Sequence, residues 1–349
     1  MPSQDFADRL AALRARYSND AADVVDDPAF RRAATVAFNA QGRRALPYSG
    51  VSTLLDLEYR PDAPDLADFG GLQVAAIGVP MDLAVTNRAG SRLGPRAVRQ
   101  VERIGPYNHA LKVTPKAELR AADVGDVPFR SRYSLPDSIE DIAAFYARVI
   151  DAGVLPLSVG GDHSISYPIL RAVGRDRPVG LVHIDAHCDT SAPAEGSRFH
   201  HGGPFRQAAL DGVIDPKRSI QIGIRGSAEM LYEFSYTSGM TVIHAEDMQS
   251  LTTVAVIERA RAVIGDGPFY LSLDVDAMDP AFTPGTGTPE VGGLTPREVQ
   301  AIIRGLAGCD IVGGDVVEVA PQYDATTNTA QIGAAMLFEI FCLMALRAA

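Results

Sequence analysis

Short apolar runs alternate with amphipathic segments from about residue 72 to the C-terminus of this 349-residue chain. The runs have the length of buried strands, and the segments between them show the apolar spacing of helices. The predicted strands are 72–79, 154–159, 179–184, 219–224, 240–243, 269–273 and 310–317. The predicted helices are 95–104, 139–152, 165–173, 205–210, 254–264, 296–306 and 330–346. Strands joined through helices need crossover connections, so the pattern predicts a single-domain α/β fold, with a mostly parallel sheet and helices on both faces.

Residues 1–70 differ from the rest of the chain. Four apolar residues recur there at helical spacing and predict a helix over 6–17: Phe6, Leu10, Leu13 and Tyr17. The sequence then becomes irregular and contains several prolines. We therefore expect an N-terminal extension over 1–70 and a main domain over 71–349. The extension would wrap around the main domain or a neighbouring subunit. The alternative for its first 25 residues is a partly disordered tail.

Composition limits the partners and the compartment of the chain. A net charge of −11 and a predominantly acidic balance argue against nucleic acid or an anionic membrane as a partner. Three scattered cysteines do not provide a disulfide framework. We find neither an apolar run of the length that spans a membrane nor a basic segment followed by an apolar leader. The expected location is cytoplasmic.

Polar side chains follow three of the predicted strands. Asp185, His187 and Asp189 alternate directly after a strand, so an extended backbone sends them to one face. A second alternating pair, Asp274 and Asp276, ends another strand. The edge of an α/β sheet where strands end is where its ligands usually bind.

A third strand is followed by Gly-Gly-Asp-His (160–163), which adds His163 to these side chains. Each motif alone is more typical of a turn, a helix cap or a solvated pair. Together they favour a metal site, because burying so many carboxylates without cations would cost several kcal/mol each. Oxygen ligands mixed with imidazole suit Mn²⁺ and also admit Fe, Co, Ni or Zn. By alternation, Cys188 should point away from these ligands and pack in the interior.

Other common sites are missing from the sequence. No Gly-x-Gly-x-x-Gly follows the first predicted strand and no phosphate-binding loop is found, so nothing supports a nucleotide site. The Gly-x-Ser-x-Gly motif of serine hydrolases is also missing.

Two further residues fit a hydrolytic centre. Two divalent ions about 3.5–4 Å apart can lower the pKa of water and so provide a nucleophile at neutral pH. Glu318 closes another apolar strand, and a carboxylate there could bind a planar guanidinium through two hydrogen bonds. The alternative for Glu318 is an ion pair with one of the chain's own arginines. Either His200 or His201 could carry protons, although for His200 we favour a capping or solvent-facing role.

Three motifs resemble the signature motifs of the ureohydrolases, the arginase and agmatinase family. They are Gly-Gly-Asp-His-Ser (160–164), Asp-Ala-His-Cys-Asp-Thr (185–190) and Ser-Leu-Asp-Val-Asp-Ala-Met-Asp-Pro (272–280). Segments 87–96, 284–293 and 318–324 resemble the agmatinase-like branch, and the resemblance covers about residues 72–349. It implies an arginase-like three-layer α/β/α fold. It also implies a binuclear manganese enzyme that hydrolyses guanidino groups to urea and an amine, with Ni²⁺ as the alternative metal, assembled as a homo-trimer or hexamer.

The resemblance also implies roles for individual residues. One metal ion would take His163, Asp189 and two shared carboxylates, Asp185 and Asp274. The second ion would take His187, Asp276 and the same two carboxylates. His201 matches the family's proton-carrying histidine, and Glu318 matches its guanidinium-binding glutamate. All six ligands are present, so nothing suggests an inactive copy.

The identity of the guanidino substrate is left open by the sequence. Arg198 could bind the carboxylate of a guanidino acid such as guanidinobutyrate, whereas an agmatine enzyme would sooner place acidic or apolar groups there. Glu195 lies in the same loop. The alternative is a hydrolase of free guanidine, a substituted guanidine or a biguanide, with nickel as the metal. Two other classes are a non-catalytic subunit of a hetero-oligomer and a one-metal zinc deacylase, for which His163 and Asp276 would be superfluous.

Overall fold

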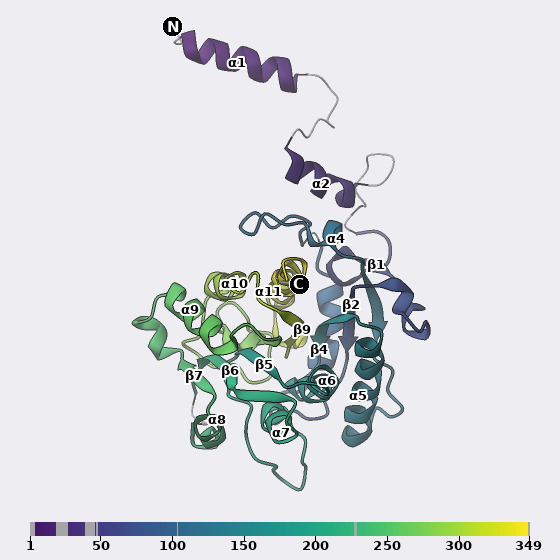
Figure 1. Cartoon of the computed structure of the whole chain (residues 1–349), viewed down its shortest axis with the longest axis vertical. Helices are drawn as coiled ribbons and strands as arrows, with labels where there is room; N and C mark the ends of the chain where they lie inside the picture. Colours follow the sequence, from purple (N-terminus) through teal and green to yellow (C-terminus); the bar gives the residue numbers. More distant parts are fainter. Residues whose placement is uncertain are drawn as a thin grey trace.

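A nine-stranded, wholly parallel sheet forms the centre of the protein. The computed structural model describes residues 4–18, 27–38, 46, 48–102, 104–226 and 229–347. The strand order is β1-β3-β2-β4-β9-β8-β5-β6-β7 (Figure 1). The strands are β1 (Glu58–Tyr59), β2 (Val74–Val79), β3 (Ala121–Asp126), β4 (Leu155–Gly160), β5 (Val179–Ile184), β6 (Ile214–Ile224), β7 (Thr241–His244), β8 (Phe269–Asp274) and β9 (Ile311–Val317). The last strand of the chain, β9, therefore lies near the middle of the sheet, between β4 and β8.

Helices cover both faces of this sheet. The helices are α1 (Gln4–Tyr17), α2 (Pro28–Ala37), α3 (Gly94–Arg99), α4 (Pro115–Glu118), α5 (Leu135–Asp151), α6 (Ser166–Val173), α7 (Pro204–Leu210), α8 (Glu233–Ser238), α9 (Thr253–Ile264), α10 (Pro296–Arg304) and α11 (Asn328–Ala345). Successive side chains of β2 enter two separate cores: one contains residues of α3, α9, α10 and α11, and the other residues of α5, α6 and α7. The predicted α/β class, with one mostly parallel sheet between helices, is confirmed.

The predicted strands and helices of the main domain are all present, with ends that shift by up to five residues. Two strands, β1 and β3, were missed. β1 has only two residues. β3 carries Asp123, a fully buried carboxylate that accepts hydrogen bonds from the Leu54 backbone N–H and the Arg99 side chain. Because a charged residue occupies a core position of β3, its sequence lacks the apolar run that reveals the other strands.

The C-terminal helix α11 is a core helix. By length and composition it could cross a membrane, but 72% of that stretch is buried inside the protein. It packs on β9, and its buried carboxylate Glu339 is bound by Arg304 of α10 and by Asn108. This packing in the core explains why the sequence of α11 is so apolar.

The segment expected as an N-terminal extension, residues 1–70, contains α1 and α2, but also β1 and the buried Leu54, which are part of the sheet and core of the main domain. The predicted helix over 6–17 corresponds to α1, which has no buried residue and lies away from the sheet (Figure 1). Of its apolar residues, Leu13 and Tyr17 are 56% and 61% exposed. In contrast, α2 touches the main domain, where Phe30 meets the ring of Tyr107 edge-on at 5.4 Å. Residues 1–3, 19–26 and 39–45 lie outside the described residues.

Candidate active site

The residues predicted to bind metal gather at one edge of the sheet. Because β4, β9, β8 and β5 are neighbours and run parallel, their carboxyl ends meet there. His163 follows β4, Asp185 directly follows β5, Asp274 is the last residue of β8, and Glu318 directly follows β9. All four residues are buried. The sheet therefore brings together side chains that are up to 155 residues apart in the sequence.

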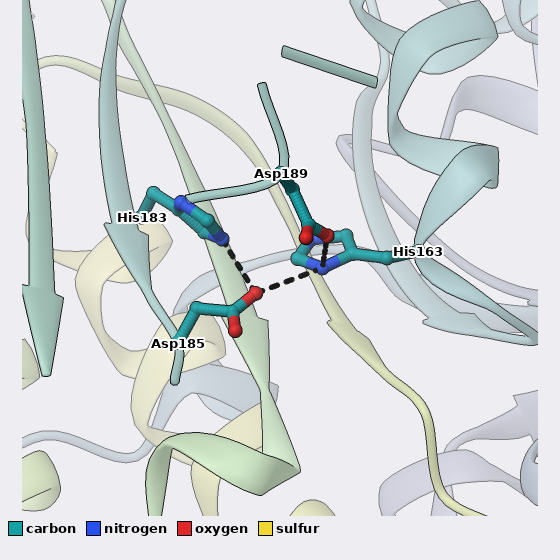
Figure 2. A group of neighbouring side chains, drawn as sticks. All are labelled: His163, His183, Asp185 and Asp189. Carbon is teal, nitrogen blue, oxygen red and sulfur yellow. Dashed lines mark hydrogen bonds and ion pairs between the residues drawn. The ribbon is translucent and has the colours of Figure 1, made fainter. Parts of the chain in front are cut away.

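The first group of ligands surrounds the ring of His163. Its Nδ1 atom lies 3.0 Å from an oxygen of Asp185, 2.9 Å from Asp189 and 3.4 Å from Asp274. Among the described residues, this buried nitrogen has no partner with hydrogen-bond geometry. Figure 2 shows three of these side chains, with His183 beside Asp185. Three carboxylates that converge on one ring nitrogen without a hydrogen bond fit a shared cation.

The second group surrounds His187, whose Nδ1 atom lies 3.2 Å from Asp276 Oδ2 and 3.5 Å from Asp185 Oδ1. The two oxygens of Asp185 thus face different histidines, Oδ2 toward His163 and Oδ1 toward His187. A carboxylate in this position can bridge two ions. The arrangement groups His163 with Asp189 on one side of Asp185, and His187 with Asp276 on the other.

Electrostatics at this edge also fit divalent cations. Burial, together with the charges of Asp276 and Asp185, raises the pKa of Asp274 well above its usual range. Burial and the charge of Asp185 raise the pKa of Asp276 to about 6. These carboxylates repel one another in the protein alone, and cations between them would remove that cost. Their oxygens, combined with two imidazoles, suit Mn²⁺ and neighbouring transition metals.

A buried hydrogen-bond chain orients His163. Its Nε2 atom lies 2.8 Å from the Ser272 hydroxyl, which donates to Asp315 at 2.6 Å. Because the Ser272 proton is used on Asp315, the hydroxyl oxygen accepts from Nε2–H of His163. When the ring is neutral, Nδ1 is then unprotonated and faces the carboxylates, which is the state that a metal ligand requires.

Glu318 and His201 form the adjacent part of the site. The Oε1 atom of Glu318 accepts hydrogen bonds from the His163 backbone N–H at 2.9 Å and from His201 Nδ1 at 2.8 Å. The Oε2 atom is buried and has no partner among the described residues. Glu318 also has a φ of 64°, a strained conformation that costs about 1–3 kcal/mol. The fold thus holds an unpaired carboxylate oxygen at a fixed position beside the ligands.

His201 is bonded on both sides of its ring. Opposite Glu318, its Nε2 atom lies 2.7 Å from the hydroxyl and 3.1 Å from the backbone nitrogen of Thr86. Burial alone would lower the pKa of His201, but the charge and hydrogen bond of Glu318 outweigh it and raise the pKa to about 9. The Thr86 hydroxyl can donate to the neutral ring or accept from the protonated one.

The structure does not bring Arg198 into this group. Its guanidinium binds Gln207 of α7 at 2.8 Å. It also lies 3.3 Å from the hydroxyl of Tyr167 on α6 and 3.4 Å from Asp211, just after α7. His200 bonds the carbonyl oxygen of Ala192 at 2.9 Å, a local contact within its own loop. Arg198 therefore stabilises the loop that carries it, and nothing in its contacts points to the Glu318 side of the site.

Sequence reasoning missed His183, which touches Asp185 and lies beside the first ligand group. The signal was present, since His183 continues the alternation of Asp185 and His187 one step toward the N-terminus. It was overlooked because it lies inside an otherwise apolar strand. Cys188 behaves as expected and packs with Ile224 and Tyr232.

Comparison with known proteins identifies the family. Residues 72–342 match the model of the arginase family. The chain belongs to this family. It is 47% identical to a guanidinopropionase of Pseudomonas aeruginosa over 306 residues, which cover 86% of this chain and 94% of the relative. It is 45% identical to a mitochondrial agmatinase of Gallus gallus, covering 84% and 86% of the two chains.

A solved structure of this arginase-family fold agrees with the sheet described above. Proclavaminate amidino hydrolase from Streptomyces clavuligerus superposes with a TM-score of 0.80 at 33% identity, covering 86% of this chain and 99% of that one. Like these relatives, the protein is a hydrolase that acts on carbon–nitrogen bonds. The family resemblance, the arginase-like fold and the enzyme class expected from the sequence are confirmed.

Proposed function

We propose that this member of the arginase family hydrolyses the guanidino group of a small guanidino acid, such as guanidinopropionate or guanidinobutyrate. The products would be urea and an amine, and the reaction would use two divalent metal ions, Mn²⁺ in preference to Ni²⁺. The observation that carries the proposal is the buried, unpaired Oε2 atom of Glu318 beside the histidine and aspartate ligands.

Glu318 suits a guanidinium for reasons of charge and shape. An unpaired carboxylate oxygen in the interior is costly, and a cationic N–H donor would satisfy it. A side-chain carbon added at Gly287 would lie 3.8 Å from Oε2 and only 2.9 Å from the backbone oxygen of Arg88, so glycine keeps the space beside Glu318 free of a side chain. A planar guanidinium bound to Glu318 would donate charge-assisted hydrogen bonds.

The six predicted ligands would hold the metal pair, with Asp185 and Asp274 shared. When bound, divalent cations supply the Lewis acidity that activates water and polarises the substrate. Glu318 would hold the guanidinium beside these ligands. Hydrolysis would add a water oxygen to the guanidinium carbon and break its bond to the amine nitrogen, so a proton would have to reach that nitrogen as it leaves.

His201 is the proposed carrier of that proton. Glu318 holds its Nδ1–H, so the exchange of protons would take place at Nε2. There the Thr86 hydroxyl can accept from the protonated ring, and the hydroxyl and backbone N–H of Thr86 can donate to the neutral one. Thr86 is exposed, which would connect His201 with solvent once the amine has left. Removal of the ring would leave Glu318 Oε1 with only the His163 backbone N–H as a donor. It would also leave the departing amine without a proton donor.

Two observations support a substrate with a carboxylate group. One is the name of the guanidinopropionase relative, and the other is Arg88, whose side chain contacts Gly287 beside Glu318. Arg88 lies on the loop after β2, and its side chain donates to the backbone oxygens of Thr286 and Gly287 at 2.9 and 3.2 Å. Its guanidinium stacks on Tyr323 at 4.5 Å. No hydrogen bond from its Nη1 atom to a described residue is found, so this donor could bind a carboxylate.

The direct test measures urea release from a panel of guanidino compounds after loading the metal-free protein with Mn²⁺, Ni²⁺ or Zn²⁺. The panel contains guanidinopropionate, guanidinobutyrate, agmatine, arginine, free guanidine and a biguanide, and amines are assayed as well as urea. We expect the guanidino acids to react fastest with Mn²⁺. Faster release from agmatine, free guanidine or the biguanide would reject the guanidino-acid assignment and keep the family chemistry. Inactivity on every compound with two metal ions bound would favour a non-catalytic subunit.

The assembly and location belong to the same proposal. The exposed apolar residues of α1 and its position away from the sheet support an extension that packs on a neighbouring copy of the chain in a trimer or hexamer. The cysteines at 188, 309 and 342 are all free, which supports a reducing compartment such as the cytoplasm. Deleting residues 1–26 and measuring mass in solution tests the role of α1, since an unchanged oligomer would reject it.

A further inference from the structure

We propose that His183 and Gln221 form a buried positioning pair that holds the bridging carboxylate Asp185 in the orientation needed by both metal ions. This inference rests on the proposed two-metal centre. It concerns two residues that bind neither metal nor substrate and that act through Asp185.

The pair is built by the register of the sheet. His183 of β5 and Gln221 of β6 are direct cross-strand partners, so their side chains point to the same face at adjacent positions. Both side chains are fully buried, as is Asp185. The ring of Phe205 packs 4.3 Å from the ring of His183 and closes the remaining side. Because solvent does not reach these groups, no water can replace a lost donor.

A backbone carbonyl fixes which atom donates in this pair. The Nε2 atom of Gln221 lies 2.6 Å from the carbonyl oxygen of Cys188, and only the amide nitrogen can donate there. That same nitrogen lies 3.0 Å from Nδ1 of His183, so Nδ1 accepts the second amide hydrogen. The proton of the neutral ring must then be on Nε2, which donates to Asp185 Oδ2 at 2.7 Å.

This donor completes a symmetrical set of hydrogen bonds to Asp185. Its Oδ2 atom receives the His183 Nε2–H, and its Oδ1 atom receives the backbone N–H of His187 at 2.6 Å. Each oxygen keeps a lone pair on the side of the histidine that it faces, His163 or His187, where a metal ion would bind. With one donor on each oxygen, the carboxylate plane cannot turn about its bond, and both oxygens stay aimed at different ions.

The same geometry argues against His183 as a metal ligand, although its ring lies within reach of the first ligand group. A ligating Nε2 would need a free lone pair, and the proton would have to move to Nδ1, where it would oppose the Gln221 amide hydrogen. The amide cannot turn over, because its oxygen would then face the Cys188 carbonyl oxygen. His183 therefore acts by donating to Asp185, as histidines and carboxylates behind metal ligands commonly do.

The test compares metal binding by full-length, metal-free variants through competition with a chelating indicator for Mn²⁺. His183→Phe removes the donor and keeps the ring volume, whereas His183→Gln keeps an N–H donor for Asp185. Gln221→Met removes the amide that sets the ring tautomer. The matched control is Gln207→Met, the same change at another buried glutamine, whose contact is to Arg198. Thermal unfolding in the presence of chelator checks that each metal-free variant folds.

We expect His183→Phe to bind Mn²⁺ about 10–100-fold more weakly than the wild type, in line with losses on removing partners of metal ligands. His183→Gln should stay within about threefold of the wild type, Gln221→Met should lie between the two, and Gln207→Met should be unchanged. If His183→Phe fails to fold, Gln221→Met decides the question.

Three results would overturn the inference. Wild-type affinity in both His183→Phe and Gln221→Met would show that Asp185 needs no such support. If His183→Gln lost one bound ion as completely as His183→Phe, this would show that His183 is itself a ligand. A wild-type chain that binds no Mn²⁺ would instead refute the proposed two-metal centre, and this inference with it.

Discussion

The edge of the sheet that carries the ligands and the loop over residues 190–200 lie next to each other but are built differently. At the edge, the ligand aspartates are buried and backbone donors hold three of them: Asp185 accepts from the His187 N–H, Asp274 from the Asp276 N–H and Asp276 from the Ala186 N–H. In the loop, side chains from 192 to 196 are exposed, and a short turn between Ala194 and Ser197 holds the backbone.

This difference separates what the fold determines from what a loop can vary. Changing a ligand at the edge leaves other buried charges without a partner of opposite charge, which lowers the stability of the protein by several kcal/mol. Changing a residue of the loop removes contacts that water can largely replace. Chemistry in this family should therefore depend on the sheet, and the choice of guanidino compound on the loops around it.

Loss of an edge ligand should have the largest effect. We expect Asp276→Asn to bind one Mn²⁺ where the wild type binds two, and to lose at least about 1,000-fold in kcat/KM, roughly 4 kcal/mol. Elemental analysis after metal loading and urea kinetics measure both quantities. Asp266→Asn, at an exposed position, is the matched control. If Asp276→Asn kept full activity with a single ion, the two-metal proposal would be wrong.

Glu318→Gln should have the next largest effect. The amide keeps the shape but not the charge, so a charge-assisted contact with the guanidinium becomes a neutral one. We expect kcat/KM to fall at least about 100-fold, roughly 2.7 kcal/mol, while two metal ions remain bound. Glu195→Gln in the exposed loop should leave kcat/KM unchanged. Near-normal kinetics in Glu318→Gln would mean that another residue binds the cation.

His201→Gln should lower the stability of the metal-free protein in a pH-dependent way. The folded-state pKa of about 9 lies above the unfolded value of about 6.5. The ion pair with Glu318 therefore contributes fully below pH 6.5, and its contribution is lost as the pH rises through 9. We expect the wild type to exceed His201→Gln by about 1–3 kcal/mol at pH 6 and by much less at pH 10. Denaturant unfolding at both pH values measures the difference, and an equal gap at both would contradict a charged His201.

Arg88→Ala and Arg198→Ala compare two arginines near the site. We expect Arg88→Ala to raise the KM for guanidino acids about tenfold, roughly 1.4 kcal/mol, more than it raises the KM for free guanidine. Arg198 is partly exposed and bonded to Gln207, so Arg198→Ala should change kcat/KM for every substrate by less than about threefold. The opposite pattern, with acids selectively weakened in Arg198→Ala, would support the sequence-based prediction that Arg198 binds the carboxylate.

Sequence analysis predicted the architecture and the residues at the edge of the sheet more fully than their surroundings. Seven of the nine strands were found, because each is an apolar run. The expected ligands follow those runs directly, so their positions along the chain determine where they meet. The structure places His163, Asp185 and Asp189 together, as the family resemblance implied.

The remainder could not be predicted because it depends on contacts between distant segments. The direction of Arg198 is decided by Gln207 and by Asp211 beyond α7, and nothing within its own loop marks either of them as a partner. The role of Gln221 requires the register between β5 and β6. Such pairings are set by packing across the sheet, for which one sequence gives no direct signal.

The central position of β9 has a consequence for synthesis on the ribosome. Before residues 311–317 emerge, β1, β3, β2 and β4 can form one half-sheet, and β8, β5, β6 and β7 another, each ending in an unpaired strand edge. Such edges are prone to association with other chains. We therefore expect nascent chains stopped before residue 310 to require chaperones, and completion of β9 to join the halves and bring Glu318 into the site at the same moment.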